Sequence, residues 1–371
     1  MKGNGQKKQM IETEKILQTK ISSRITRKEI KPNKRIDKIL SEICLAFNIE
    51  KPKVLFCDTL TRRISSFEFR GTWYIVFDNS LFEFLFLYDK LIISDTDTAD
   101  VDKLYYKILY EECLFQEYPL ALPCYQMYKS KTFSFEDQFD NETNVHMAYQ
   151  LHFLLLHEIA HIKFSQNNNR QDFLDFKEVM FRSLFIAVKE ELTQRSPGGV
   201  SSIKKGLLNF FGVNADIAGS SDATWDDLPY MLEMGKMDAL LEECYCDFQA
   251  FKYIFETYHD PKTEISASYS LLHFLISSEF IRNSFSKHTI TMNKDIDIPS
   301  FTSILRIMMF SLIVSFNECD IEKTLLVKCT KIFSRYSEIL DIVNSLPKTA
   351  TDAKLKASLI KMSREYKFEE G

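Results

Sequence analysis

The stretch LHFLLLHEIAHIKF, residues 151–164, contains the motif His157-Glu158-Ile159-Ala160-His161, on which the interpretation of the whole chain depends. Successive residues of an α-helix are rotated by about 100°, so His157 and His161 lie on one face, one turn apart. From residue 151 to 162, every residue except His152 and the histidines and glutamate of the motif is apolar. The pattern predicts a largely buried helix. Burying two imidazoles and a carboxylate is costly unless something compensates for it.

Two histidines at positions i and i+4 of a helix can bind a single Zn²⁺ through their imidazoles. Glu158 follows the first histidine and is offset from it, so its carboxylate can approach a water on the metal without binding the metal itself. This position suits a general base. Because a catalytic zinc site takes three protein ligands and keeps one position open, we expect a third ligand from another part of the chain.

A second stretch, LLEECYCDFQAF at residues 240–251, places Glu243, Asp247 and Ala250 at i, i+4 and i+7 of one helical face. Together the two motifs resemble those of the glutamate-zincin metallopeptidases, which combine H-E-x-x-H on one helix with E-x-x-x-D and a small residue on a later helix. The resemblance implies that Glu243 is the third zinc ligand and that Asp247 hydrogen-bonds a ligating histidine. A zinc-bound imidazole normally donates its other N–H to such a carboxylate.

Glu242 competes with Glu243 for the role of third ligand. Four residues after Glu242 comes Cys246 rather than an acidic residue, which favours Glu243. The chain departs from the family pattern at Cys246, where alanine is usual, and in the 82 positions between His161 and Glu243. A zinc site made by Cys244 and Cys246 is excluded on a helix, because residues two apart point about 200° away from each other.

The β-structure is predicted from residues 54–57 and 66–77. Phe67 to Arg70 alternate with period two, Gly71-Thr72 supplies a turn, and residues 73–77 are β-rich. Ser80 and Glu83 fit a capping box, so a helix should follow the strands. The strands either lie beside a cleft, where an extended substrate adds by backbone hydrogen bonds, or belong only to the core.

The remaining segments predict mainly helices. Residues 119–142 indicate a loop leading into a helix that starts near residues 141–143, and the glycine-rich residues 198–235 indicate a flexible insertion or lid. Apolar periodicity predicts helices near 238–258, 264–285, 301–317 and 321–345. We therefore expect a predominantly helical α+β fold, with a zincin-like catalytic core, a small β-sheet and a helical C-terminal extension. The expected domains are a basic helical arm (1–50), the catalytic domain (51–260) and a helical region (261–371).

Composition limits the class of protein. The 371 residues are 45% hydrophobic and 27% charged, which is typical of a soluble globular protein and excludes fibrous classes. Residues 1–40 carry a net charge of +8 against −5 for the whole chain. They lack interleaved aromatic residues and any recognisable binding module, so we do not expect a nucleic-acid partner. We find no export signal at the N-terminus, which predicts a cytoplasmic protein. The chain has no run of about 18 apolar residues, so we expect no membrane span. Its eight cysteines are scattered, which indicates reduced thiols.

The leading hypothesis is a zinc-dependent endopeptidase acting on a protein or peptide substrate, with Zn²⁺ held by His157, His161 and Glu243 and with Glu158 as the base. The chain also loosely resembles the phage-exclusion peptidases of bacteria. The alternative is a regulatory protein that keeps a zincin-like core and binds a partner through its basic arm and C-terminal helices. The sequence does not identify an oxyanion donor among the downstream residues Tyr245, Tyr258, His259, His273 and His288.

Overall fold

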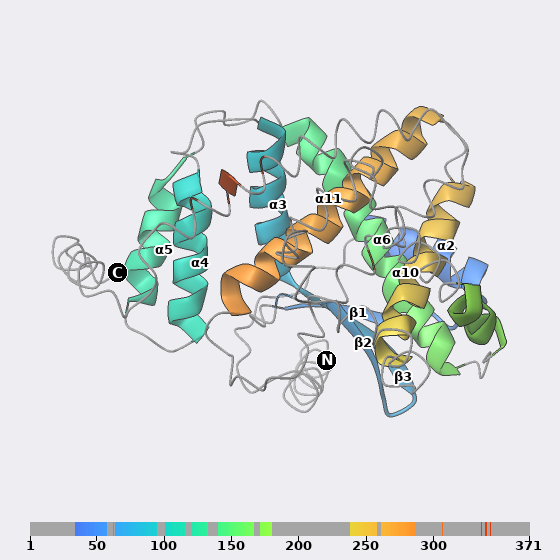
Figure 1. Cartoon of the computed structure of the whole chain (residues 1–371). Helices are drawn as coiled ribbons and strands as arrows, with labels where there is room; N and C mark the ends of the chain where they lie inside the picture. The colour runs from blue at the N-terminus through green and yellow to red at the C-terminus, as the bar shows by residue number, and fades with distance from the viewer. Residues whose placement is uncertain are drawn as a thin grey trace, which may run out of the picture. The chain divides into compact units, whose positions relative to one another are not determined.

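The computed structural model of the chain describes residues 34–57, 62, 64–94, 101–115, 120–132, 140–166, 171–179, 238–257 and 261–286, together with residues 306, 335, 338, 339 and 342. These residues are mainly helical and include one small sheet (Figure 1), so the expected helix-rich α+β class is confirmed. The predicted glycine-rich lid at 198–235 lies outside the described residues, as do most of the predicted helices at 301–317 and 321–345. None of the described helices is both long and apolar enough to cross a membrane.

The sheet has three strands in the order β1-β3-β2, formed by β1 (Lys53–Cys57), β2 (Ile64–Phe69) and β3 (Thr72–Asp78). β3 pairs in parallel with β1 and antiparallel with β2, and it is buried from Tyr74 onward, as expected for a central strand. The strands predicted from alternation are thus confirmed.

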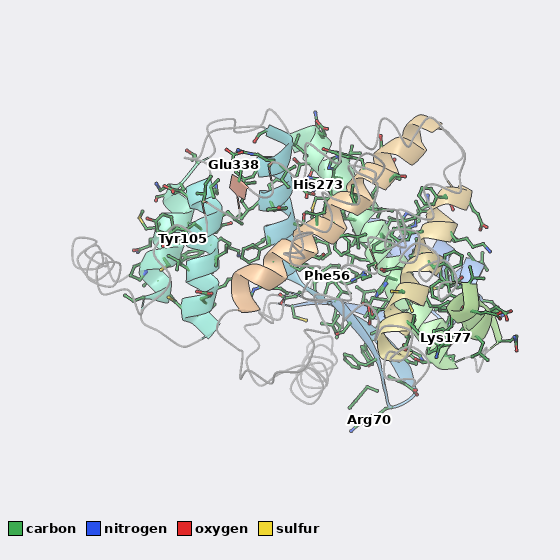
Figure 2. All side chains as sticks on the ribbon, in the orientation of Figure 1. Phe56, Arg70, Tyr105, Lys177, His273 and Glu338 are labelled. Carbon is green, nitrogen blue, oxygen red and sulfur yellow. The ribbon has the colours of Figure 1, made fainter. Side chains whose placement is uncertain are left out.

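The hairpin between β2 and β3 turns at Arg70 and Gly71, whose φ angles are +52° and +74°. Figure 2 shows Arg70 at the tip of this hairpin. Two consecutive residues with positive φ match the right-handed twist of the flanking strands. The turn lies one residue earlier than predicted, because Thr72 already pairs with Phe69.

Helix α3 (Asn79–Ser94) follows β3 directly, which confirms the predicted helix. The predicted capping box is wrong. Asp78 caps the helix, since its carboxylate accepts hydrogen bonds from the backbone N–H of Ser80 at 3.0 Å and of Arg62 at 2.7 Å. Glu83 instead pairs with the buried Lys107.

Three further helices accompany the sheet: α2 (Lys34–Phe47), α4 (Val101–Phe115) and α5 (Ala121–Ser130). The loop predicted for residues 119–142 is wrong over α5, because Pro123 lies in the first turn of that helix, where proline removes no hydrogen bond. Five described side chains of α2 are buried, namely Ile36, Leu40, Ile43, Cys44 and Phe47.

The longest of the described helices is α6 (Asp140–Gln166), which begins within one residue of its predicted start and carries the H-E-x-x-H motif. It packs against α10 (Asp238–Thr257) and α11 (Pro261–Ser286) (Figure 1). Residues 171–179 are also helical. The helices predicted near 238–258 and 264–285 are confirmed.

The chain divides into two compact units. Among the described elements, one unit contains α2, the sheet, α3 up to Tyr88, α4 from Asp102 and α5. The other unit contains α3 from Asp89, α6, α10 and α11. The domain limits expected at residues 50 and 260 stay a prediction, and so does a role of the sheet in holding substrate.

Candidate metal centre

Helices α6 and α10 bring the two sequence motifs together. On α6, Nε2 of His157 lies 3.1 Å from Nε2 of His161. Facing them on α10, the Glu243 carboxylate places Oε2 3.3 Å from Nε2 of His157 and Oε1 3.4 Å from Nε2 of His161. One donor atom from each of the three residues, which are up to 86 positions apart in the sequence, lies within 4.8 Å of the others.

These spacings fit a tetrahedral metal ion. Zinc binds nitrogen and carboxylate oxygen at about 2.0–2.2 Å, so two of its ligand atoms at the tetrahedral angle lie about 3.3 Å apart. The 3.1 Å between the two Nε2 atoms is close to this value, and so are the distances from each Nε2 to the nearer of the two Glu243 oxygens, 3.3 Å for His157 and 3.4 Å for His161. Two imidazoles and one carboxylate are also a donor set found at catalytic zinc. The residues present therefore fit the ion that the sequence predicts.

Asp247 contacts the first histidine of the motif, His157, at the ring nitrogen that does not face Glu243. Its Oδ1 lies 2.8 Å from Nδ1 of His157, and Arg306 donates to its two oxygens from Nε and from Nη2 at 2.9 Å. Asp247 is fully buried. Burial alone would raise the pKa of its carboxyl group, but the charges of Arg306 and His157 lower the pKa below its ordinary value. Asp247 is thus held as a carboxylate beside the imidazole.

Glu242 supports the second histidine. Its Oε1 lies 3.0 Å from Nδ1 of His161, on the side of the ring opposite to Glu243. The two adjacent glutamates therefore contact different nitrogens of His161. Glu243 alone reaches the Nε2 atoms of both histidines, and Glu242 is placed to orient one ring.

Two of these partners were not expected from the sequence. The sequence pattern presents Glu242 only as a competitor of Glu243 for the role of third ligand. Nothing in the pattern points to Arg306, which lies 59 residues beyond Asp247. A pairing over such a distance is decided by helix packing, which leaves no local sequence signal.

The electrostatics of the three proposed ligands are strongly coupled. Burial opposes charge on both histidines, but the neighbouring carboxylates, and for His161 the Cys246 thiol, raise their pKa above the ordinary value. Burial likewise opposes charge on Glu243, yet the two imidazoles lower the pKa of its carboxyl group. A negatively charged carboxylate thus faces two imidazoles that hold their protons more tightly than usual, and a metal ion that binds here would displace those protons.

The site has one open side. The Glu243 side chain is 40% exposed, whereas the side chain of His157 is only 7% exposed. Solvent can therefore reach the three proposed ligands from the Glu243 side.

Glu158 is 5% exposed and lies next to His157 on α6. Within the described part of the chain, its carboxylate has no hydrogen-bond or ion-pair partner. A carboxylate that is this little exposed and has no partner is unfavourable for stability.

The nearby cysteines do not join the ligand set. Cys244 and Cys246 are buried free thiols. Burial raises the pKa of Cys246 to about 11, against the opposing influence of His161, so its thiol is protonated at neutral pH. Tyr245, one of the residues considered as an oxyanion donor, packs its ring against Phe164, Phe173 and Phe176. Tyr258, His259 and His288 lie outside the described residues.

Comparisons of the chain with protein families, curated proteins and solved structures find no match.

Proposed function

We propose that the protein is a zinc-dependent endopeptidase, with His157, His161 and Glu243 as the metal ligands and Glu158 as the general base. The observation that carries the proposal is that donor atoms of two imidazoles and one carboxylate lie within 4.8 Å of one another, next to a glutamate that is buried and has no partner among the described residues. A site that only stabilised the fold would not need an unpaired carboxylate next to its ligands.

Zinc bound by these residues supplies Lewis acidity, which lowers the pKa of a water molecule and polarises a peptide carbonyl. Glu158 accepts the proton of the attacking water and then donates it to the nitrogen of the leaving amine. Asp247 and Glu242 fix the orientation of the His157 and His161 rings through their Nδ1 atoms. The open side next to Glu243 admits the substrate.

The test of this function is the variant Glu158→Gln, with Glu256→Gln as the matched control on an exposed position of α10. Both proteins are incubated with unfolded proteins of known sequence, and the products are identified by mass spectrometry. We expect Glu158→Gln to lose cleavage by a factor of about 100 or more while keeping its zinc, because an amide cannot accept the proton. Glu256→Gln should cleave like the wild type. Equal cleavage by Glu158→Gln and wild type would eliminate Glu158 as the base.

A further inference from the structure

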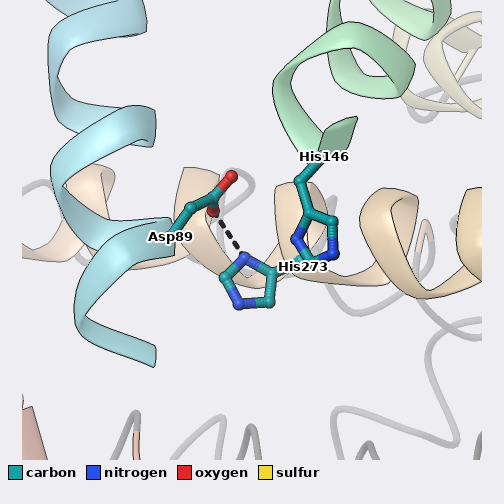
Figure 3. Close-up of side chains that lie close together, drawn as sticks. All are labelled: Asp89, His146 and His273. Carbon is teal, nitrogen blue, oxygen red and sulfur yellow. Dashed lines mark hydrogen bonds and ion pairs between the residues drawn. The ribbon is translucent and has the colours of Figure 1, made fainter. Parts of the chain in front are cut away.

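A second group of metal-binding side chains lies on the same unit, away from the first. Asp89 of α3, His146 of α6 and His273 of α11 meet between the three helices (Figure 3). One donor atom from each lies within 4.8 Å of the others. Asp89 and His273 are fully buried, and His146 is 4% exposed.

The contacts within this group are close. Nδ1 of His273 lies 2.5 Å from Oδ1 of Asp89, and the rings of His146 and His273 meet edge to face at 5.6 Å. Gln150, also fully buried, donates from Nε2 to Oδ2 of Asp89 at 2.8 Å and to the carbonyl of Ser270 at 3.4 Å.

This group is separate from the proposed catalytic ligands. His146 and His157 are 11 residues apart, which places them on the same face of α6 but about 16 Å apart along its axis. Between them, the ring of Phe153 packs against Phe251 at 4.9 Å and Phe274 at 5.6 Å. One ion cannot be shared, and the distance also exceeds the roughly 4 Å of two-metal catalytic sites.

The carboxylate of Asp89 and the amide of Gln150 are compensated only in part by their hydrogen bonds. Among the described residues, the partners of Asp89 are Gln150 and His273, and no lysine or arginine pairs with its buried carboxylate. Oε1 of Gln150 is also buried, without a hydrogen-bond partner in the described part of the chain. A cation bound between Asp89, His146 and His273 would neutralise the carboxylate.

We propose that Asp89, His146 and His273 bind a second divalent transition-metal ion of the zinc class. Imidazole nitrogen and carboxylate oxygen are suitable ligands for such ions. Because the group is sealed from solvent, the site is structural: it fixes the last turns of α3 to α6 and α11. This site does not depend on the proposed peptidase activity.

The test counts zinc per chain by elemental analysis of the full-length protein purified in the presence of Zn²⁺. The key variant is the double substitution His157→Ala and His161→Ala, which removes the first site and should leave one zinc of the two in the wild type. His146→Phe keeps an aromatic ring against Tyr269 but removes the donor, so it should lose the other zinc. His152→Phe on the same helix is the matched control and should keep both.

The outcomes separate the two sites. Retention of one zinc by the double-alanine protein, together with a lower Tm after chelation, supports the second site. Complete loss of zinc from that protein overturns it and leaves Asp89, Gln150 and His273 as a hydrogen-bonded network only. If His146→Phe does not fold, the double-alanine count decides alone. A wild-type protein with a single zinc, lost in His146→Phe but kept in the double-alanine protein, would refute the catalytic site and support this one.

Discussion

The sharpest prediction concerns the adjacent residues Glu242 and Glu243. The structure places Glu243 against the Nε2 atoms of both histidines and Glu242 against Nδ1 of His161 only. Substituting each by alanine therefore removes a metal ligand in one protein and an orienting partner in the other. Because the two side chains are chemically identical neighbours on α10, each variant is the control for the other.

The expected sizes of the two effects differ. Structural zinc sites bind with about 10–16 kcal/mol over four ligands, so one ligand contributes about 3–4 kcal/mol. Loss of Glu243 should then weaken zinc binding several hundred-fold. Loss of a partner that orients a ligand costs about 10–100-fold. The Glu242 side chain is 32% exposed, so we expect a value near the lower end for Glu242→Ala.

The assay is competition for Zn²⁺ against a chromophoric chelator of known affinity, at one pH and one ionic strength. Circular dichroism shows whether both variants keep the helical content of the wild type. We expect Glu243→Ala to bind zinc at least ten times more weakly than Glu242→Ala. The reverse order, with Glu242→Ala the weaker binder, would show that the ligand is Glu242 and that the register of α10 against α6 is wrong.

Three further predictions concern the surroundings of the site and the fold. Asp247→Asn should weaken zinc binding by about 10–100-fold in the same competition assay, and unchanged affinity would contradict its role at His157. Burial raises the pKa of Glu112 from 4.5 to about 7, with Arg62 opposing. Between these two pH values the unfolded chain releases a proton that the folded protein keeps, so Glu112 costs stability as pH rises, at most about 3 kcal/mol. Glu112→Gln should therefore increase the free energy of unfolding, measured with urea, at pH 8 but not at pH 4.5. An equal increase at the two pH values would contradict the raised pKa of Glu112. Gly71→Ala should lower the free energy of unfolding by about 1 kcal/mol, because φ is +74° although an added Cβ would meet no atom within 4 Å. An unchanged Tm would mean that the turn relaxes.

Elements with a strong local pattern were predicted well. The alternation at residues 67–70 predicted β2 and its turn, and the apolar run around His157 predicted α6. Predictions failed where a neighbour distant in the sequence, or a local exception, decided the outcome. The capping box at Ser80 was wrong because Asp78 caps α3 while Glu83 binds Lys107 of another helix. The loop at residues 119–142 was wrong because proline is tolerated in the first turn of α5.

The sequence by itself determined which residues could form the proposed metal site, because H-E-x-x-H and E-x-x-x-D are spaced by helical periodicity and helical periodicity is local. Only the tertiary structure decided that Glu243 rather than Glu242 faces both histidines and that Arg306 holds Asp247. It also brought together Asp89, His146 and His273, which span 184 residues and have no common motif. The physical reason is that the contacts between helices depend on the packing of whole faces, and a rotation of one helix by a single residue changes which side chains meet.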